Sequence, residues 1–270
     1  MSTRAQVLIS AAELAEMIES GSPVAILDVR WQLAEPDGRA AFERGHLPGA
    51  VYVSLEDELS DHAVPGRGRH PLPSGAAVQA AARRWGVRTG VPVVVYDDWN
   101  RAGSARAWWV LTAAGIGDVR ILDGGLAAWR GELVTGPSSA QPGDVTVRYA
   151  DLYAGALPTL TAEQAAAAPV LLDARAPERF RGDVEPVDPV AGHIPGARNL
   201  PSTALLAADG TFALDALPRF DGPVGAYCGS GVTAAVLVAA LAATGVDAAL
   251  FPGSWSQWSA DPTLPVDTGD

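Results

Sequence analysis

An internal repeat constrains the fold of this chain more than any other feature of its sequence. Four segments of the first half return in the second half in the same order. The pairs are 24–30 with 170–175, 45–50 with 192–197, 93–97 with 224–228, and 123–129 with 252–258. Four ordered matches are not expected by chance. The sequence therefore predicts two homologous domains in tandem.

Each half alternates short apolar runs with longer stretches rich in Ala and Leu. The apolar runs are 24–27, 93–96, 119–122, 170–172, 224–227 and 248–251, and the helical stretches are 102–114 and 232–243. Continuous apolar runs of this length are typical of strands that are buried on both faces of a parallel sheet. Capping-box patterns at 10–13 and 161–164 indicate further helix starts. We expect an α/β fold in which each half has a central, mostly parallel sheet flanked by helices.

The boundary between the two halves is marked by composition. The stretch 136–143 reads Gly-Pro-Ser-Ser-Ala-Gln-Pro-Gly, which is typical of a linker. We therefore expect a first domain over 1–135, a linker over 136–150 and a second domain over 151–270.

The charge of the chain limits its partners and its chemistry. It has 19 basic and 31 acidic residues, for a net charge of −12, and every basic residue is Arg. Without Lys there is no Schiff-base or phosphate-loop lysine. The acidic balance argues against nucleic acid as a partner. No apolar run has the length of a membrane helix, and the first residues lack the apolar stretch of a signal peptide. We expect a cytoplasmic protein with no membrane partner.

Cys228 is the single cysteine of the chain, so neither an internal disulfide nor a zinc site built on several cysteines is possible. It directly follows the expected strand 224–227 and precedes a Gly-Ser-Gly turn and a helix. Such a turn points backbone N–H groups at its first residue, and the helix start adds partial positive charge. Both effects favour a thiolate. The alternative is a cysteine that only packs at the end of a strand, but Asp97 takes the same place in the first half.

The segment 228–233, Cys-Gly-Ser-Gly-Val-Thr, resembles the active-site loop of two-domain rhodanese-family sulfurtransferases, in particular their 3-mercaptopyruvate branch. Segments 172–175, 179–182, 192–196 and 253–258 resemble other signatures of that family, and the first half resembles its inactive domain. The resemblance implies that Cys228 takes a sulfane sulfur from a small anionic donor. It also implies that the resulting persulfide passes that sulfur to an external thiol or cyanide. No metal or organic cofactor is implied. Loop residues implied to surround the sulfur and the donor are Gly229, Gly231, Val232 and Thr233.

Donor choice is indicated by the two residues after the cysteine. The thiosulfate enzymes of the family carry Arg-Lys there, whereas this chain has Gly229 and Ser230. The resemblance therefore favours 3-mercaptopyruvate, and it implies that Ser230 relays a proton with a His and an Asp of the first domain. We assign these to His46 and Asp37. The alternative for His46 is a structural role, because the second half repeats the same Gly-His-x-Pro-Gly motif.

Arginines are the candidates for binding the donor. Arg179 matches a family residue that binds the anionic group, and a guanidinium can hold a carboxylate through two parallel hydrogen bonds. Arg175 is a second candidate, with a structural ion pair as its alternative. The mercaptopyruvate enzymes usually carry another arginine where this chain has Val187. That departure leaves thiosulfate open as a donor.

Other functions remain to be weighed against sulfur transfer. A phosphatase of the same fold needs Cys-x5-Arg, and Ala234 occupies the arginine position. A non-catalytic binding module is a further alternative, although the intact cysteine loop of the second half argues against it for the whole chain. A carrier that delivers persulfide sulfur to a partner enzyme would use the same chemistry at Cys228.

Overall fold

The N-terminal half of the computed structural model, which describes residues 3–270, contains one parallel sheet. Its strands are β1 (Leu8–Ile9), β2 (Ala25–Asp28), β3 (Ala50–Tyr52), β4 (Val93–Tyr96) and β5 (Val119–Leu122). They lie in the order β1-β5-β4-β2-β3, and every pairing is parallel. Because the carboxyl ends of parallel strands share one edge, the loops after β2 and β4 lie side by side.

The C-terminal half repeats this arrangement. Its strands are β6 (Val170–Asp173), β7 (Arg198–Asn199), β8 (Val224–Tyr227) and β9 (Ala248–Leu250), in the order β7-β6-β8-β9. All pairings are again parallel. The predicted tandem α/β fold is confirmed, and the six predicted strands agree with the structure to within one residue at either end. The sequence missed β1, β3 and β7, which are too short to show a periodic pattern.

Helices cover both sheets. The first half has α1 (Thr3–Val7), α2 (Ala11–Glu19), α3 (Arg39–Arg44), α4 (Leu55–Glu58), α5 (Gly75–Arg84), α6 (Ala102–Ala113) and α7 (Gly125–Ala128), and the second half has α8 (Ala162–Ala166), α9 (Pro177–Arg181), α10 (Ala234–Ala243) and α11 (Ser254–Trp258). Both expected capping boxes are present, at Ser10 and Thr161. No helix within the described residues 3–270 is long and apolar enough to cross a membrane.

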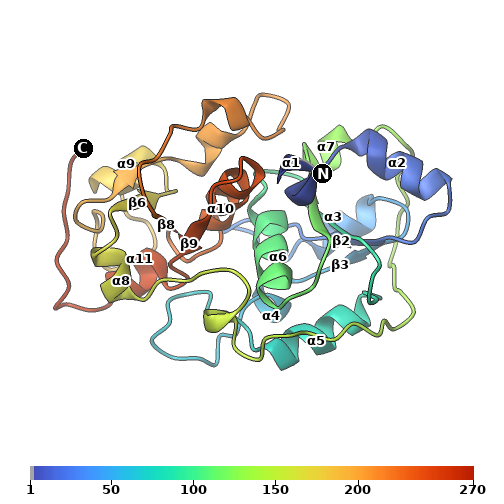
Figure 1. The fold of residues 1–270 in the computed structure, drawn as a ribbon, viewed down its shortest axis with the longest axis horizontal. Helices are drawn as coiled ribbons and strands as arrows, with labels where there is room; N and C mark the ends of the chain where they lie inside the picture. The colour runs from blue at the N-terminus through green and yellow to red at the C-terminus, as the bar shows by residue number, and fades with distance from the viewer. Residues whose placement is uncertain (1–2) are drawn as a thin grey trace.

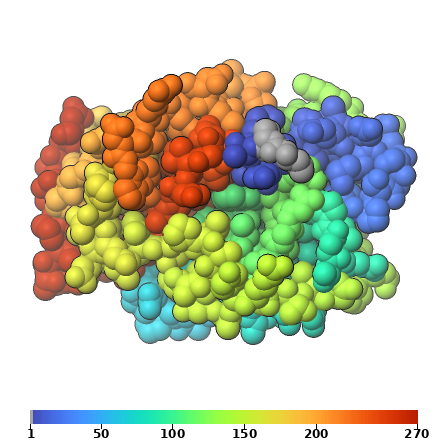
Figure 2. All heavy atoms as spheres, in the orientation of Figure 1, coloured from blue at the N-terminus to red at the C-terminus, as the bar shows by residue number. Residues whose placement is uncertain are grey.

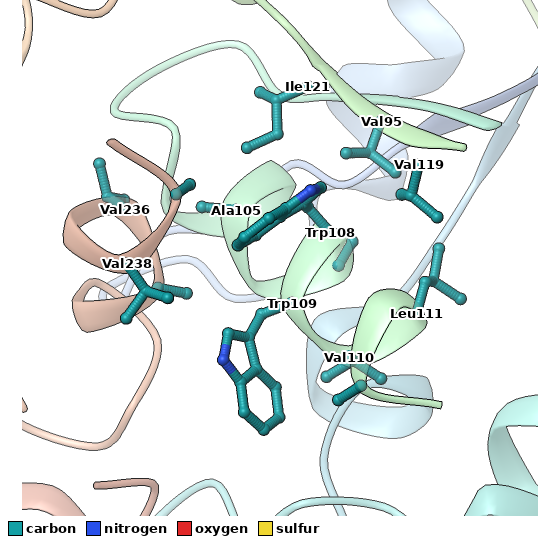
Figure 3. Packing of buried hydrophobic residues seen from close by; sticks show 14 of the residues in the cluster. Val95, Ala105, Trp108, Trp109, Val110, Leu111, Val119, Ile121, Val236 and Val238 are labelled. Carbon is teal, nitrogen blue, oxygen red and sulfur yellow. The ribbon is translucent and has the colours of Figure 1, made fainter. Parts of the chain in front are cut away.

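The two halves pack together through α6 and α10, which lie between the sheets (Figure 1). Nearly all residues of both helices are buried, as expected for helices that are apolar on all sides. Figure 3 shows α6 between the strand residues Val95 and Ile121 and the α10 residues Val236 and Val238. One hydrophobic core thus runs through both domains. This shared core fixes the loops that meet at the domain junction.

The segment 136–150 forms neither a helix nor a strand. It lies along the N-terminal domain, where the N–H of Gly143 donates to the carbonyl of Arg83 at 2.7 Å and that of Val145 to the carbonyl of Val87 at 3.3 Å. In Figure 2 this yellow-green stretch crosses the visible face of the molecule toward the C-terminal half. The segment is therefore hydrogen-bonded to the first domain over part of its length.

Candidate active site

Cys228 lies directly after β8, at the carboxyl edge of the second sheet, and the residue is only 1% exposed to solvent. Its N–H donates to Ser254 Oγ at 3.1 Å, and its carbonyl accepts from the N–H of Trp255 at 3.0 Å. Ser254 is itself buried and has a φ of +52°. These bonds tie the cysteine to the start of α11, so the backbone holds the sulfur in a fixed position.

The loop after Cys228 points a backbone amide at the sulfur. The N–H of Gly231 donates to Cys228 Sγ at 3.2 Å. Gly231 has a φ of +77°, and a Cβ atom there would lie 2.5 Å from the carbonyl oxygen of Pro252. Only glycine fits at this position without displacing the backbone. The amide stabilises negative charge on the sulfur, as a hydrogen bond to an anion does in general.

The equivalent loop of the N-terminal domain holds an anion. The Asp97 carboxylate, directly after β4, accepts the backbone N–H groups of Trp99 at 3.1 Å, Arg101 at 3.3 Å and Ser104 at 3.1 Å. The Arg101 guanidinium pairs with the same carboxylate at 2.9 Å. Turns of this kind concentrate N–H groups around a negative group. A loop of this design therefore suits a thiolate or persulfide where cysteine replaces the aspartate.

Cys228 lines a cavity of about 280 Å³ at the junction of the two domains. The first domain contributes Trp31, Leu33, Arg69, Trp99 and Asn100, and the second contributes Ala174, Arg175, Ala176, Arg179, Ser202, Gly229, Ser230, Val232 and Thr233. A larger hollow of about 590 Å³ lies between α2 and residues 128–131, but its lining has neither cysteine nor histidine. The cysteine, Ser230 and Arg179 therefore all line the smaller cavity.

A hydrogen-bonded chain runs from Ser230 into the N-terminal domain. Ser230 Oγ lies 2.7 Å from His70 Nδ1, and His70 Nε2 lies 3.1 Å from Glu56 Oε1. Trp31 Nε1 also donates to Glu56 Oε1, at 2.6 Å. The hydrogen bond from His70 lowers the pKa of Glu56 to about 2. Burial lowers the pKa of His70, although Glu56 favours its charged form.

These directions fix the protonation states at neutral pH. Glu56 is ionised and can only accept, so neutral His70 carries its proton on Nε2. His70 Nδ1 is then free to accept the proton of the Ser230 hydroxyl. These hydrogen bonds therefore allow a proton to move from Ser230 to His70, because the imidazole is neutral before the transfer.

The predicted partners of Ser230 were wrong. His46 Nδ1 faces the carbonyl oxygen of Phe42 at 2.9 Å, and its ring stacks on that of Phe42 at 3.8 Å. His193 repeats this geometry with Phe180, at 2.8 Å and 3.8 Å. The motif histidine therefore has the same structural place in both domains. Asp37 is exposed and accepts from the Tyr52 hydroxyl at 3.1 Å.

Sequence reasoning missed His70 because nothing around it forms a pattern. It lies in an irregular stretch between α4 and α5, and its partner Ser230 is 160 residues away. The only local signal is the combination of two glycines and two arginines just before it. Such a composition indicates a loop but not its target.

The expected arginines lie at the wall of the cavity, each held by carboxylates. Arg179 Nη2 pairs with Glu185 at 2.7 Å and with Asp188 at 3.3 Å. Arg175 is buried and pairs with Asp173 at 2.6 Å and with Glu185 at 3.5 Å. Arg175 therefore makes the structural ion pair that was its alternative, and it also holds the carboxylate that orients Arg179.

The sequence profile described as "Rhodanese-like domain" matches two regions of the chain, residues 10–132 and 157–261. The chain belongs to the rhodanese-like family. The first matched region contains β2 to β5 and the second contains β6 to β9, so the internal repeat corresponds to two rhodanese-like domains.

Relatives of this rhodanese-like chain match all or nearly all of its length. A Mycobacterium tuberculosis protein, SseB, named as a candidate thiosulfate sulfurtransferase, is 69% identical and covers 100% of this chain and 99% of its own. A Pseudomonas aeruginosa protein named as a candidate 3-mercaptopyruvate sulfurtransferase is 44% identical over 97% of this chain and 98% of its own. The solved structure of Escherichia coli SseA, described as a 3-mercaptopyruvate sulfotransferase, superposes with a TM-score of 0.79 at 32% identity, covering 92% of this chain and 98% of SseA.

Proposed function

We propose that this chain is a sulfurtransferase in which Cys228 carries the sulfur as a persulfide. The observation that supports it most is the Gly231 N–H aimed at Cys228 Sγ, 3.2 Å away, at the wall of a cavity between the domains. Amides placed where negative charge resides are the usual means of stabilising a sulfur anion. The Asp97 carboxylate, which accepts backbone N–H groups in the equivalent loop, supports the same proposal.

The first half-reaction loads the cysteine. The Cys228 thiolate attacks the sulfur of 3-mercaptopyruvate, so that an S–S bond forms and the C–S bond breaks. The electron pair of the C–S bond goes to carbon, which leaves as the enolate of pyruvate. The proton of the donor's S–H group passes through the Ser230 hydroxyl and His70 Nδ1 to that enolate carbon. The products are the Cys228 persulfide anion and pyruvate.

The second half-reaction unloads the cysteine. A thiophilic acceptor, cyanide or a thiol, attacks the outer sulfur, the S–S bond breaks and Cys228 leaves as a thiolate. The chain has no second cysteine to resolve the persulfide, so the acceptor comes from outside. A reducing compartment such as the cytoplasm keeps the single thiol free for this cycle.

Two donors are compatible with the cavity. The hydrogen bonds from Ser230 through His70 to Glu56 favour 3-mercaptopyruvate, because only that donor leaves a carbanion-like group that needs a proton. The Mycobacterium tuberculosis relative is named for thiosulfate, and Arg179 at the cavity wall suits either anion. We place 3-mercaptopyruvate first and keep thiosulfate as the second candidate.

Intact-protein mass spectrometry tests the persulfide directly. Because Cys228 is the single thiol, a gain of one sulfur atom after incubation with 3-mercaptopyruvate reports on that residue alone. We expect the gain in the wild type, its removal by cyanide with release of thiocyanate, and no gain in Cys228→Ser. Turnover by Cys228→Ser, or a wild type that takes no sulfur from either donor, would contradict the proposal.

Steady-state kinetics decide the donor. We expect a higher kcat/KM for 3-mercaptopyruvate than for thiosulfate, with cyanide as the acceptor in both assays. The reverse order would make thiosulfate the donor and would leave the Ser230–His70 pair without a role in proton transfer.

A further inference from the structure

The three residues 68–70 of the N-terminal domain contact the loop after Cys228 and the start of α11 in the other domain. Gly68, with a φ of +83°, approaches so closely that a Cβ would lie 2.4 Å from the carbonyl oxygen of Gly253. The N–H of Arg69 donates to Ser256 Oγ at 3.0 Å, and His70 reaches Ser230. Arg69, between these two anchors, has its side chain at the cavity wall.

Arg69 and Arg179 converge on one face of Gly229. A Cβ built on Gly229 would lie 3.2 Å from Arg69 Nη2 and 3.5 Å from Arg179 Nη1. Both guanidinium groups also pair with Asp188, whose side chain is 3% exposed. Two cations from different domains are therefore held next to each other, one residue along the chain from the cysteine.

Part of each guanidinium is left without a protein acceptor among the described residues. Arg69 pairs with Asp188 through Nη1, whereas its Nη2 is the atom nearest Gly229. The Arg179 hydrogen bonds to Glu185 and Asp188 use Nε and Nη2, whereas Nη1 is the atom nearest Gly229. The Nη2 of Arg69 and the Nη1 of Arg179, both beside Gly229 at the cavity wall, are therefore placed to donate to an anion in the cavity.

The segment after Glu185 has Val187 where the mercaptopyruvate enzymes usually carry an arginine, so it supplies no positive charge there. The Val187 side chain is apolar and 40% exposed, and only its backbone N–H takes part, by donating to Glu185 Oε1 at 3.0 Å. The carboxylates Glu185 and Asp188 would leave Arg179 nearly neutralised if it acted alone. A second positive charge is needed to attract an anionic donor.

We propose that Arg69 is the second residue that binds the anionic group of the donor, a carboxylate or a thiosulfate oxyanion, together with Arg179. This inference rests on the proposed sulfur transfer, and it makes donor recognition a property of the two domains together. Arg69 reaches the anion from the N-terminal domain, Arg179 from α9, and Asp188 holds the two guanidinium groups at a common position.

Binding to an inactive variant separates this inference from the proposed activity. In a Cys228→Ser background, which cannot form a persulfide, isothermal calorimetry gives the Kd of 3-mercaptopyruvate and of thiosulfate. Adding Arg69→Gln keeps the length of the side chain and the backbone hydrogen bond but removes the charge. We expect the Kd of both anions to rise about 10-fold, the loss of one charge-assisted hydrogen bond.

Arg67→Gln is the matched control. Arg67 is in the same loop and its guanidinium lies over the Tyr153 ring at 4.6 Å, outside the cavity. This control removes the same charge from the same segment, and we expect its Kd values to stay within about twofold of the parent. A second variant, Arg69→Gln with Val187→Arg, returns a cation from the other domain and should recover part of the lost affinity.

Arg69→Gln values within about twofold of the parent would overturn the inference, as would equal losses in Arg67→Gln. A wild type that transfers no sulfur would instead contradict the proposed function. Because the binding measurement needs no turnover, a rise in Kd specific to Arg69→Gln supports the anion site even in that case.

Discussion

Arg106 Nη1, on α6 of the N-terminal domain, lies 3.3 Å from the carbonyl oxygen of Gly231, in the loop that follows Cys228 of the other domain. Its Nη2 donates to the carbonyls of Leu59 at 3.0 Å and His70 at 2.9 Å. Burial lowers the pKa of Arg106 to about 10, so the group is still charged at neutral pH. One buried guanidinium thus joins the loop of Cys228 to the loop of His70.

Arg106→Met should destabilise the protein and impair catalysis together. The substitution leaves three carbonyl oxygens without a donor, and we expect the free energy of unfolding to fall by about 2–5 kcal/mol. Urea denaturation measures this change. Arg84→Met, at an exposed arginine of α5, is the control and should change stability by less than about 0.5 kcal/mol. Equal midpoints for the two variants would show that the buried contacts are unimportant.

His70→Asn should lower kcat, whereas His46→Asn should lower the stability of the fold. Without an acceptor for the Ser230 proton, we expect kcat for 3-mercaptopyruvate to fall about 100-fold in His70→Asn. His46→Asn loses a stacked ring and a buried hydrogen bond, so we expect a loss of about 1–3 kcal/mol in stability with kcat nearly unchanged. Steady-state kinetics and thermal denaturation of both variants check this. A large fall in kcat for His46→Asn alone would restore the original sequence-based assignment.

The pH dependence of the mercaptopyruvate reaction should report on His70. Burial lowers the pKa of this imidazole below its ordinary value of 6.5, so the neutral form persists into mildly acidic solution. Protonation then occupies Nδ1, and kcat/KM should fall only below pH 6.5. Glu56→Gln removes the group that most favours the charged form and should move this fall to lower pH.

His62 is the control for that profile, because its Nε2 lies 3.0 Å from Glu56 Oε2 and it faces the same acid. His62→Asn should leave the acidic fall in place. A fall that begins above pH 6.5, or one that disappears in His62→Asn, would show that another group controls the rate.

Gly231→Ala tests whether the amide at the sulfur depends on glycine. The left-handed backbone alone costs about 1–2 kcal/mol for alanine, and the contact with the Pro252 carbonyl adds to it. We expect a total loss above about 3 kcal/mol, and a kcat lowered at least about 10-fold as the amide moves away from the sulfur. Chemical denaturation and kinetics measure the two effects.

Gly210→Ala separates backbone strain from the collision. Gly210 has a φ of +80°, but the nearest atom to its Cβ would be 3.7 Å away. We expect a loss of about 1–2 kcal/mol with normal kcat. Similar losses in both alanine variants would mean that the Pro252 contact relaxes without consequence.

Much of the fold could be predicted because it is encoded in short segments. The runs at 93–96 and 224–227 are apolar throughout, and the structure shows both as strands buried on both faces. The position of Cys228 between such a strand and a helix was equally local. The stretches 102–114 and 232–243 were predicted to be helices because they are rich in Ala and Leu, and the structure has α6 and α10 there, at the contact between the domains.

The partners of Ser230 show where this reasoning failed. His46 has a motif around it and so attracted the assignment, but the motif serves a turn that both domains share. His70 has no motif, and its place depends on a loop of one domain that docks on the other. The geometry of that docking is set by the packing of α6 on α10 and by Arg106.

The sequence by itself determined the two domains, their parallel sheets and the cysteine at the end of β8, since each depends on residues within one turn or one strand. Only the tertiary structure decided which histidine and which arginine of the first domain lie beside the loop that follows that cysteine. His70 and Arg69 reach partners 160 and 119 residues away, and no local propensity records such a contact. Those contacts arise from the packing of the two domains against each other, and their physical basis is the shape and charge of surfaces that exist only after folding.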